Sequence, residues 1–125
     1  MHKKTLSLLI LVIFLLTACN SRTFSFAGET DNWSAELKVN QSSGFQKQEF
    51  LLKYKGEDIS SIGEIAYHVE SVGGFGREGV TLEENGSIRH VDEANPTNAK
   101  VDENTKVEVT VEWNGNTETF NLEKK

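Results

Sequence analysis

Histidine and carboxylate side chains are the residues of this chain whose chemistry could hold a metal ion. His90 is followed at two and three residues by Asp92 and Glu93, and Glu83 lies a short distance upstream. Zinc and calcium sites need three or more converging nitrogen or oxygen ligands. His90, Asp92 and Glu93 are therefore candidate metal ligands. The alternative is that they are solvated polar residues at the end of a strand.

A glycine-rich segment is a second candidate site. Residues 74–79 spell Gly-Phe-Gly-Arg-Glu-Gly and match the GxGxxG spacing that binds a dinucleotide pyrophosphate. That mechanism needs a helix N-terminus directly after the loop, whereas the strand-like residues 80–82 follow here. We therefore predict a loop between strands that starts at Gly73 and carries Phe75 and Arg77 at its tip. Loops often carry recognition, so Phe75 and Arg77 are the candidate partner-binding residues.

No catalytic constellation is specified by the remaining polar residues. Acyl transfer needs a serine or cysteine beside a histidine and an orienting acid, and no serine here lies in a recognisable nucleophile turn. Glycoside hydrolysis needs two carboxylates facing each other across a cleft, and among the nineteen acidic residues no pair stands out. We therefore predict a protein that is not an enzyme and needs no cofactor.

The only cysteine, Cys19, follows an apparent export signal. Lys3 and Lys4 precede an apolar stretch at residues 6–16. Those eleven residues are too few for a permanent transmembrane helix, which needs about 20. Residues 16–19, Leu-Thr-Ala-Cys, resemble the lipobox of bacterial lipoproteins at all four positions. The alternative is a secretory signal in which the cysteine falls at this position by chance.

The lipobox resemblance implies both a modification and a location. Diacylglycerol would alkylate the Cys19 thiol, the soft nucleophile that this reaction needs, and a signal peptidase would then cut between Ala18 and Cys19. We expect the mature protein to be lipid-anchored at the cell membrane, on the extracytoplasmic face, with membrane lipid as a partner through Cys19. Cleavage leaves 107 residues with eleven basic and nineteen acidic side chains, a net charge of −8. Such a surface repels nucleic acid, so no nucleic-acid partner is expected.

Period-two alternation of apolar and polar residues runs through the mature chain, without a sustained helical period. The clearest case is residues 33–39, in which Trp33 shares the apolar face. Similar sets at residues 24–26, 50–54 and 65–69 are separated by clusters of Gly, Ser, Asn or Asp. This pattern predicts four strands over these ranges.

Two hairpins complete the predicted strands. Around residues 84–86, Glu-Asn-Gly, we predict a three-residue loop with a bulge and a left-handed Gly86, which places Leu82 opposite Ile88. Near the C-terminus a two-residue turn, Asn114-Gly115, predicts four cross-strand pairs: Val109 with Phe120 and Val107 with Leu122 on the buried face, and Thr110 with Thr119 and Lys106 with Glu123 on the wet face.

Seven or eight short strands predict an all-β fold, an antiparallel two-sheet immunoglobulin-like sandwich, with a small open barrel as the alternative. The predicted organisation is a signal-peptide helix at residues 1–18, the lipidated cysteine and a short tether at 19–22, and the β-sandwich domain at 23–125. Residues 92–105 lack clear alternation. We expect there a sheet-to-sheet crossover carrying a turn of helix.

A wider resemblance covers most of the mature chain. It comprises Gly28-Glu29, Asn32-Trp33, Tyr54-Lys55-Gly56 and the closing Val111-Glu112-Trp113-Asn114-Gly115, followed by Glu118 and Phe120. With the lipobox, these segments resemble small uncharacterised lipoproteins of Gram-positive Firmicutes. The resemblance implies exposure at the surface of a one-membrane cell and brings no catalytic residues.

The sequence therefore favours a membrane-anchored, non-enzymatic binding module that meets an unknown cell-envelope protein or ligand through its loops. The first alternative is an extracytoplasmic metal- or small-ligand-binding domain that uses His90, Asp92 and Glu93. The second, less favoured, alternative is an envelope hydrolase.

Overall fold

The computed structural model of the chain describes residues 21–95 and 100–125. The elements are β1 (Arg22–Glu29), β2 (Trp33–Ser42), β3 (Phe45–Tyr54), the 3-10 helix η2 (Ile59–Ser61), β4 (Glu64–Glu70), β5 (Phe75–Thr81), β6 (Ser87–Ala94), β7 (Val107–Trp113) and β8 (Asn116–Lys124). The predicted signal-peptide helix and Cys19 lie outside the described residues. Within the described ranges, no helix is long and apolar enough to cross a membrane.

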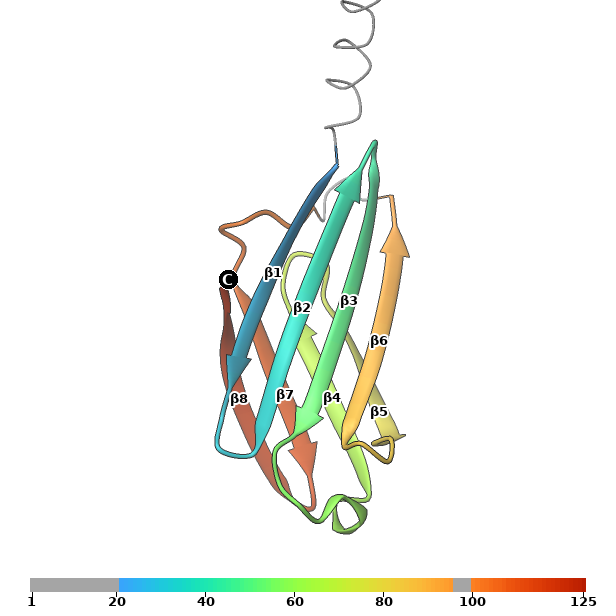
Figure 1. Ribbon diagram of the computed structural model, residues 1–125, viewed down its shortest axis with the longest axis vertical. Helices are drawn as coiled ribbons and strands as arrows, with labels where there is room; N and C mark the ends of the chain where they lie inside the picture. The colour runs from blue at the N-terminus through green and yellow to red at the C-terminus, as the bar shows by residue number, and fades with distance from the viewer. Residues whose placement is uncertain (1–20, 96–99) are drawn as a thin grey trace, which may run out of the picture.

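The eight strands form one antiparallel sheet in the order β5-β4-β7-β8-β1-β2-β3-β6. The sheet curls nearly into a barrel, with β1, β2, β3 and β6 in front of β8, β7, β4 and β5 (Figure 1). These two halves are joined through β1 and β8, which pair only at Phe26–Lys124 and Ala27–Glu123. The prediction of an all-β antiparallel fold is confirmed, and the short β1–β8 ladder is where one half continues into the other.

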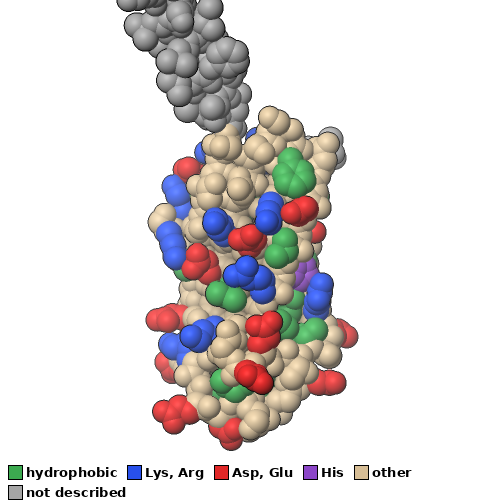
Figure 2. Space-filling view, turned by 45° about the vertical axis from the view of Figure 1, so that its right-hand side comes forward, with side chains coloured by type: hydrophobic (Ala, Val, Ile, Leu, Met, Phe, Trp, Pro, Cys, Tyr) green, Lys and Arg blue, Asp and Glu red, His purple; other side chains and the backbone are tan. Residues whose placement is uncertain are grey.

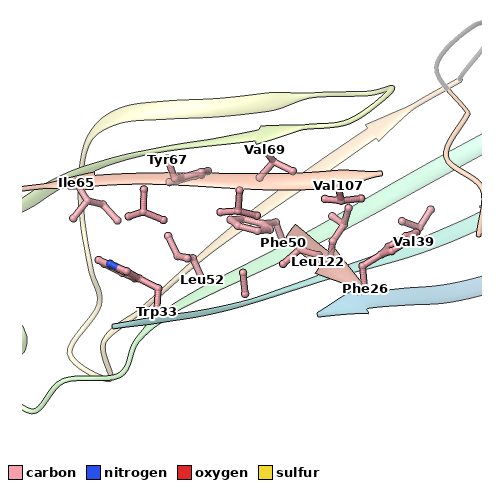
Figure 3. Close-up of a cluster of buried hydrophobic side chains, with 14 of the residues drawn as sticks. Phe26, Trp33, Val39, Phe50, Leu52, Ile65, Tyr67, Val69, Val107 and Leu122 are labelled. Atoms are coloured by element: carbon pink, nitrogen blue, oxygen red, sulfur yellow. The ribbon is translucent and has the colours of Figure 1, made fainter. Parts of the chain in front are cut away.

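The core lies between the two halves. Alternation along each strand turns one face inward, as in β2, where Trp33, Leu37 and Val39 are fully buried. Side chains from the two halves point toward one another along the length of the molecule (Figure 3). Trp33 packs against Tyr54 and Trp113, with ring centroids 5.2 and 5.4 Å away. The prediction that Trp33 belongs to the core is confirmed.

The C-terminal hairpin has its predicted register. β7 pairs with β8 through Val107–Leu122, Val109–Phe120 and Thr110–Thr119. Asn114 and Gly115 both have positive φ, 47° and 76°, as a two-residue type I′ turn requires. The Thr110 and Thr119 hydroxyls are 3.1 Å apart on the outer face. The ladder begins at Val107, so the predicted Lys106–Glu123 pair lies just outside it.

The prediction for the middle hairpin is confirmed for the turn and wrong for the pairing of the flanking strands. Glu83 and Ser87 close a three-residue turn through the 2.9 Å bond from Glu83 N–H to Ser87 C=O, and Gly86 is left-handed at φ 80°. The chain then diverges, because β5 pairs with β4 and β6 pairs with β3. Leu82 and Ile88 are therefore not partners in a ladder. β5 and β6 are the first and the last strand in the order of the sheet.

The chain after β6 crosses from one half of the sheet to the other, as predicted for residues 92–105. Residues 92–94 still belong to β6, and β7 begins at Val107 in the other half. The predicted turn of helix is not found at residues 92–95 or 100–105, the part of the crossover that the structure describes. Val101 is fully buried and anchors this crossover to the core.

Candidate functional site: the seam between β5 and β6

The seam between β5 and β6 is the place where the near-barrel is not closed by backbone pairing. Register sets which side chains face it. His90 lies opposite Phe50 on β3, while Phe75 and Arg77 lie opposite Val69 and Tyr67 on β4. Partners opposite each other in a ladder point to the same face of the sheet. Phe50, Tyr67, Phe75, Arg77 and His90, here called the seam cluster, are thereby brought together from four strands.

Aromatic packing fills this seam. The rings of His90 and Phe75 are stacked, with centroids 4.4 Å apart and an interplanar angle of 26°. Phe50 lies beneath them and meets Phe75 edge-on at 5.7 Å. The His90 Nδ1 and the Tyr67 hydroxyl are 2.7 Å apart. The phenol donates to Nδ1 when the imidazole carries its proton on Nε2. Side chains thus bridge two strands that make no ladder with each other.

The electrostatics of the seam favour neutral rings. Burial lowers the pKa of His90 below its usual value, the Arg77 charge lowers that pKa further, and Asp92 acts in the opposite direction. Burial also raises the pKa of the Tyr67 phenol, against a smaller lowering effect of Arg77. Desolvation disfavours whichever form is charged. At neutral pH the seam therefore holds an uncharged imidazole and an uncharged phenol beside one guanidinium.

Arg77 is the exposed cation of the seam cluster. Within the described ranges its guanidinium makes no hydrogen bond or salt bridge, although both neighbouring rings sense its charge. A guanidinium presents five donors in a planar fork that fits a carboxylate. Next to it, β6 forms an eight-residue ladder with β3 on one side only. Such an edge strand leaves backbone N–H and C=O groups free to pair with another chain.

Phe75 and Arg77 are not at the tip of a loop, as the sequence predicted. They belong to β5, and Phe75 is half-buried in the stack with His90. The segment can form a strand because Gly76 approaches β4 closely, since a Cβ there would lie 2.7 Å from the Tyr67 carbonyl oxygen. Gly79, at φ 62°, lies where the β4–β5 register shifts. The glycines therefore serve strand packing and a bulge.

The predicted metal ligands do not converge. His90 and Asp92 alternate on β6 with the exposed Glu93, so Glu93 points to the other face of the sheet. Glu83 lies beyond the far end of β6, in the turn before it. Across residues 21–95 and 100–125, no group of three or more His, Cys, Asp or Glu side chains could hold a metal ion. Asp92 acts on His90 only as a nearby charge.

A hollow lies on the outer face of β4, β5 and β7. It has a volume of about 610 Å³ and is lined by Tyr67 and Arg77 and by outer-face residues that include His68, Glu78 and Glu112. Gly76 also lines it, with no side chain to project into it. His68, Glu78 and Glu112 are all exposed. This is an open polar depression that adjoins the seam at Arg77.

Two members of the seam cluster, Phe50 and Tyr67, were missed as site residues, although both were predicted to lie in strands. The alternation of apolar and polar residues around them predicts a buried face. It does not predict that the edge strands β5 and β6 come together beside them. Cys19 and Ala18, the predicted lipidation and cleavage residues, lie outside the described residues. Comparison with protein-family models, with curated proteins and with solved structures finds no match to this chain.

Proposed function

We propose that the protein is a lipid-anchored, non-enzymatic binding module on the extracytoplasmic face of the cell membrane. The lipobox-like residues 16–19 support the anchor at Cys19. For the binding role, the supporting observation is the seam, where an exposed Arg77 without an ionic partner among the described residues lies beside the free edge of β6. The partner is an extended segment of a cell-envelope protein that pairs with β6 and sets a carboxylate against Arg77.

Several features of the seam favour binding over catalysis. The His90 Nδ1 is engaged by Tyr67, and the raised pKa of Tyr67 opposes formation of a phenolate nucleophile. General bases and nucleophiles need the opposite tuning, with a pKa moved toward the working pH. The stacked rings of Phe75 and His90 form a rigid apolar surface, and the Arg77 guanidinium beside it can donate hydrogen bonds to a ligand. A preorganised surface with one charged anchor is suited to recognition.

We further propose that the near-barrel is of the two-sheet immunoglobulin-like type. The β1–β8 ladder has two residue pairs, whereas β2 and β3 pair over ten. A core packed between two four-stranded halves, with so short a ladder joining them, supports a sandwich of two sheets.

Photo-crosslinking from Glu78 in intact cells tests the binding role. Glu78 is exposed on β5 next to Arg77, and the exposed Thr119 on β8 is a matched control on another strand. We expect a discrete protein adduct from position 78 and none from 119. Arg77→Glu should lower its yield by about tenfold to one hundredfold, since a hydrogen bond to a charged group contributes about 1.5–3 kcal/mol. The same adducts at both positions, or an adduct insensitive to Arg77→Glu, would contradict this surface.

A further inference from the structure

The β2–β3 hairpin tip, residues 42–45, lies at the end of the domain where the N-terminal segment enters. β1 begins at Arg22, which lies opposite Gln41 on β2, and Ser42 lies opposite Phe45 across the turn. Figure 1 shows the start of β1 beside this hairpin at the upper end of the molecule. In the sequence, only Asn20 and Ser21 separate Cys19 from Arg22. At about 3.3 Å per residue, this tether reaches about 10 Å.

The hairpin tip presents an aromatic side chain without any charge of its own. Ser42, Ser43 and Gly44 are small, and Phe45 is 45% exposed, which is high for a large apolar residue. Ser43 and Gly44 both have positive φ, 41° and 77°, which makes a tight two-residue turn. Leu51 is the next exposed apolar side chain on the same face of β3, and it is 38% exposed.

Buried hydrogen bonds hold the base of the tip rigid. The Gln41 side-chain amide donates to Gln46 Oε1 at 2.8 Å and also to the Val101 carbonyl oxygen. The Val101 N–H donates back to Gln46 Oε1 at 3.0 Å. Both glutamines are less than 10% exposed. Because buried polar groups with satisfied partners fix local geometry, Phe45 is held at the end of a stiff hairpin.

Charge is distributed so that this end is the one able to approach a bilayer. Residues 29–32, 55–64, 83–86 and 112–118, at the opposite end, contain nine carboxylates and one lysine. The other charged residues of the described chain are ten basic and ten acidic, so the far end carries the whole net charge of −8. Figure 2 shows acidic side chains gathered at the lower end and basic ones above. Anionic lipid headgroups repel such an acidic end.

We propose that the β2–β3 hairpin tip is a membrane-contact element whose Phe45 inserts into the bilayer interface. This inference rests on the proposed anchor at Cys19, because the tether brings the tip within reach of the headgroups. Phe, like Trp and Leu, is found on the apolar faces that interfacial proteins bury at the boundary between headgroups and acyl chains. A tethered residue needs little binding energy of its own, since the anchor already supplies a high local lipid concentration. Contact at the tip would hold the acidic end away from the membrane.

Depth-dependent fluorescence quenching tests the proposal. The acylated mature protein is reconstituted into vesicles of phosphatidylcholine and phosphatidylglycerol with lipids brominated near the headgroup. Phe45→Trp reports the tip. Leu51→Trp is the matched control, on the same strand and face but about 20 Å away. Trp33 and Trp113 are buried, at 0% and 9% exposure, and their emission is measured in the unsubstituted protein and subtracted.

We expect vesicle binding to shift the Phe45→Trp emission to the blue, because the indole leaves water, and the bromolipids to reduce that emission about twofold. The Leu51→Trp emission should stay unchanged. Quenching of both variants would mean that the domain lies flat on the membrane with its outer sheet face. Quenching of neither would mean that the tip does not reach the membrane. Each of these results overturns the proposal. Flotation of the same vesicles, with Cys19→Ala alongside, separates the two levels of inference. A wild-type protein that floats without quenching refutes the tip contact alone. One that does not float refutes the anchor, and the tip contact with it.

Discussion

Replacing His90 separates the two interactions by which it closes the seam. His90→Ala removes both the stack on Phe75 at 4.4 Å and the hydrogen bond to Tyr67 at 2.7 Å. His90→Phe keeps a ring for the stack and removes only the hydrogen bond. A stacked aromatic pair contributes about 1 kcal/mol beyond its buried area, and a hydrogen bond about 1 kcal/mol net. We therefore expect losses in unfolding free energy of about 2 kcal/mol for alanine and about 1 kcal/mol for phenylalanine.

Urea denaturation at pH 7.5, followed by circular dichroism, measures both losses. At about 4–8 °C per kcal/mol for a domain of this size, the corresponding falls in Tm are roughly 12 °C and 6 °C. Equal losses for the two variants would refute the role of the ring stack. A loss for neither would mean that the seam contributes nothing to closing the near-barrel.

The difference in unfolding free energy between wild type and His90→Phe should depend on pH with a defined sign. The pKa of His90 is lowered in the fold, first by burial and then by Arg77, so the unfolded chain binds the proton more readily. The contribution of neutral His90 to the unfolding free energy is therefore fully present above about pH 6.5. That contribution is lost as the pH falls from about 6.5 through the lowered pKa of His90 in the folded protein. The advantage of wild type over His90→Phe should shrink across that window. A constant difference down to pH 5 would contradict the assigned shift.

Three other perturbations test separate parts of the structure. Gly28→Ala should cost about 1–3 kcal/mol in urea denaturation, because the added Cβ meets the Asn121 carbonyl oxygen at the β1–β8 ladder; unchanged stability would refute that close approach. Gly115→Ala should cost about 1 kcal/mol by the same assay, since Gly115 has a φ of 76°, and a stabilised variant would contradict the turn. Arg77→Ala should raise the NMR-titrated pKa of His90, and an unmoved titration would exclude their electrostatic contact.

Local signals made part of this fold predictable. The β7–β8 register followed from strict alternation and one Asn-Gly turn, because both are encoded within a few residues. The turn at Gly86 was predictable for the same reason. The end of β5 was predicted from the strand-like residues 80–82, but residues 75–79 were expected to be a loop. Their glycines have low strand propensity and are held in the sheet by pairing with β4. The divergence of β5 from β6 depends on partners far away in the sequence, and alternation carries no information about them.

The seam cluster shows the same limit. Phe75, Arg77 and His90 were each singled out by residue type, but as a loop and as a metal site. Their juxtaposition with Tyr67 arises only when β3, β4, β5 and β6 come together at the open side of the near-barrel. Residue type therefore identified most of the participants, and the topology determined what they do together.

Both the binding surface and the tip contact presuppose an anchored domain, and mass spectrometry of the membrane-extracted mature protein shows whether the anchor is present. We expect a polypeptide that begins at Cys19 and carries a diacylglycerol adduct on its sulfur. A free Cys19 thiol, or a chain that retains residues 1–18, would contradict it.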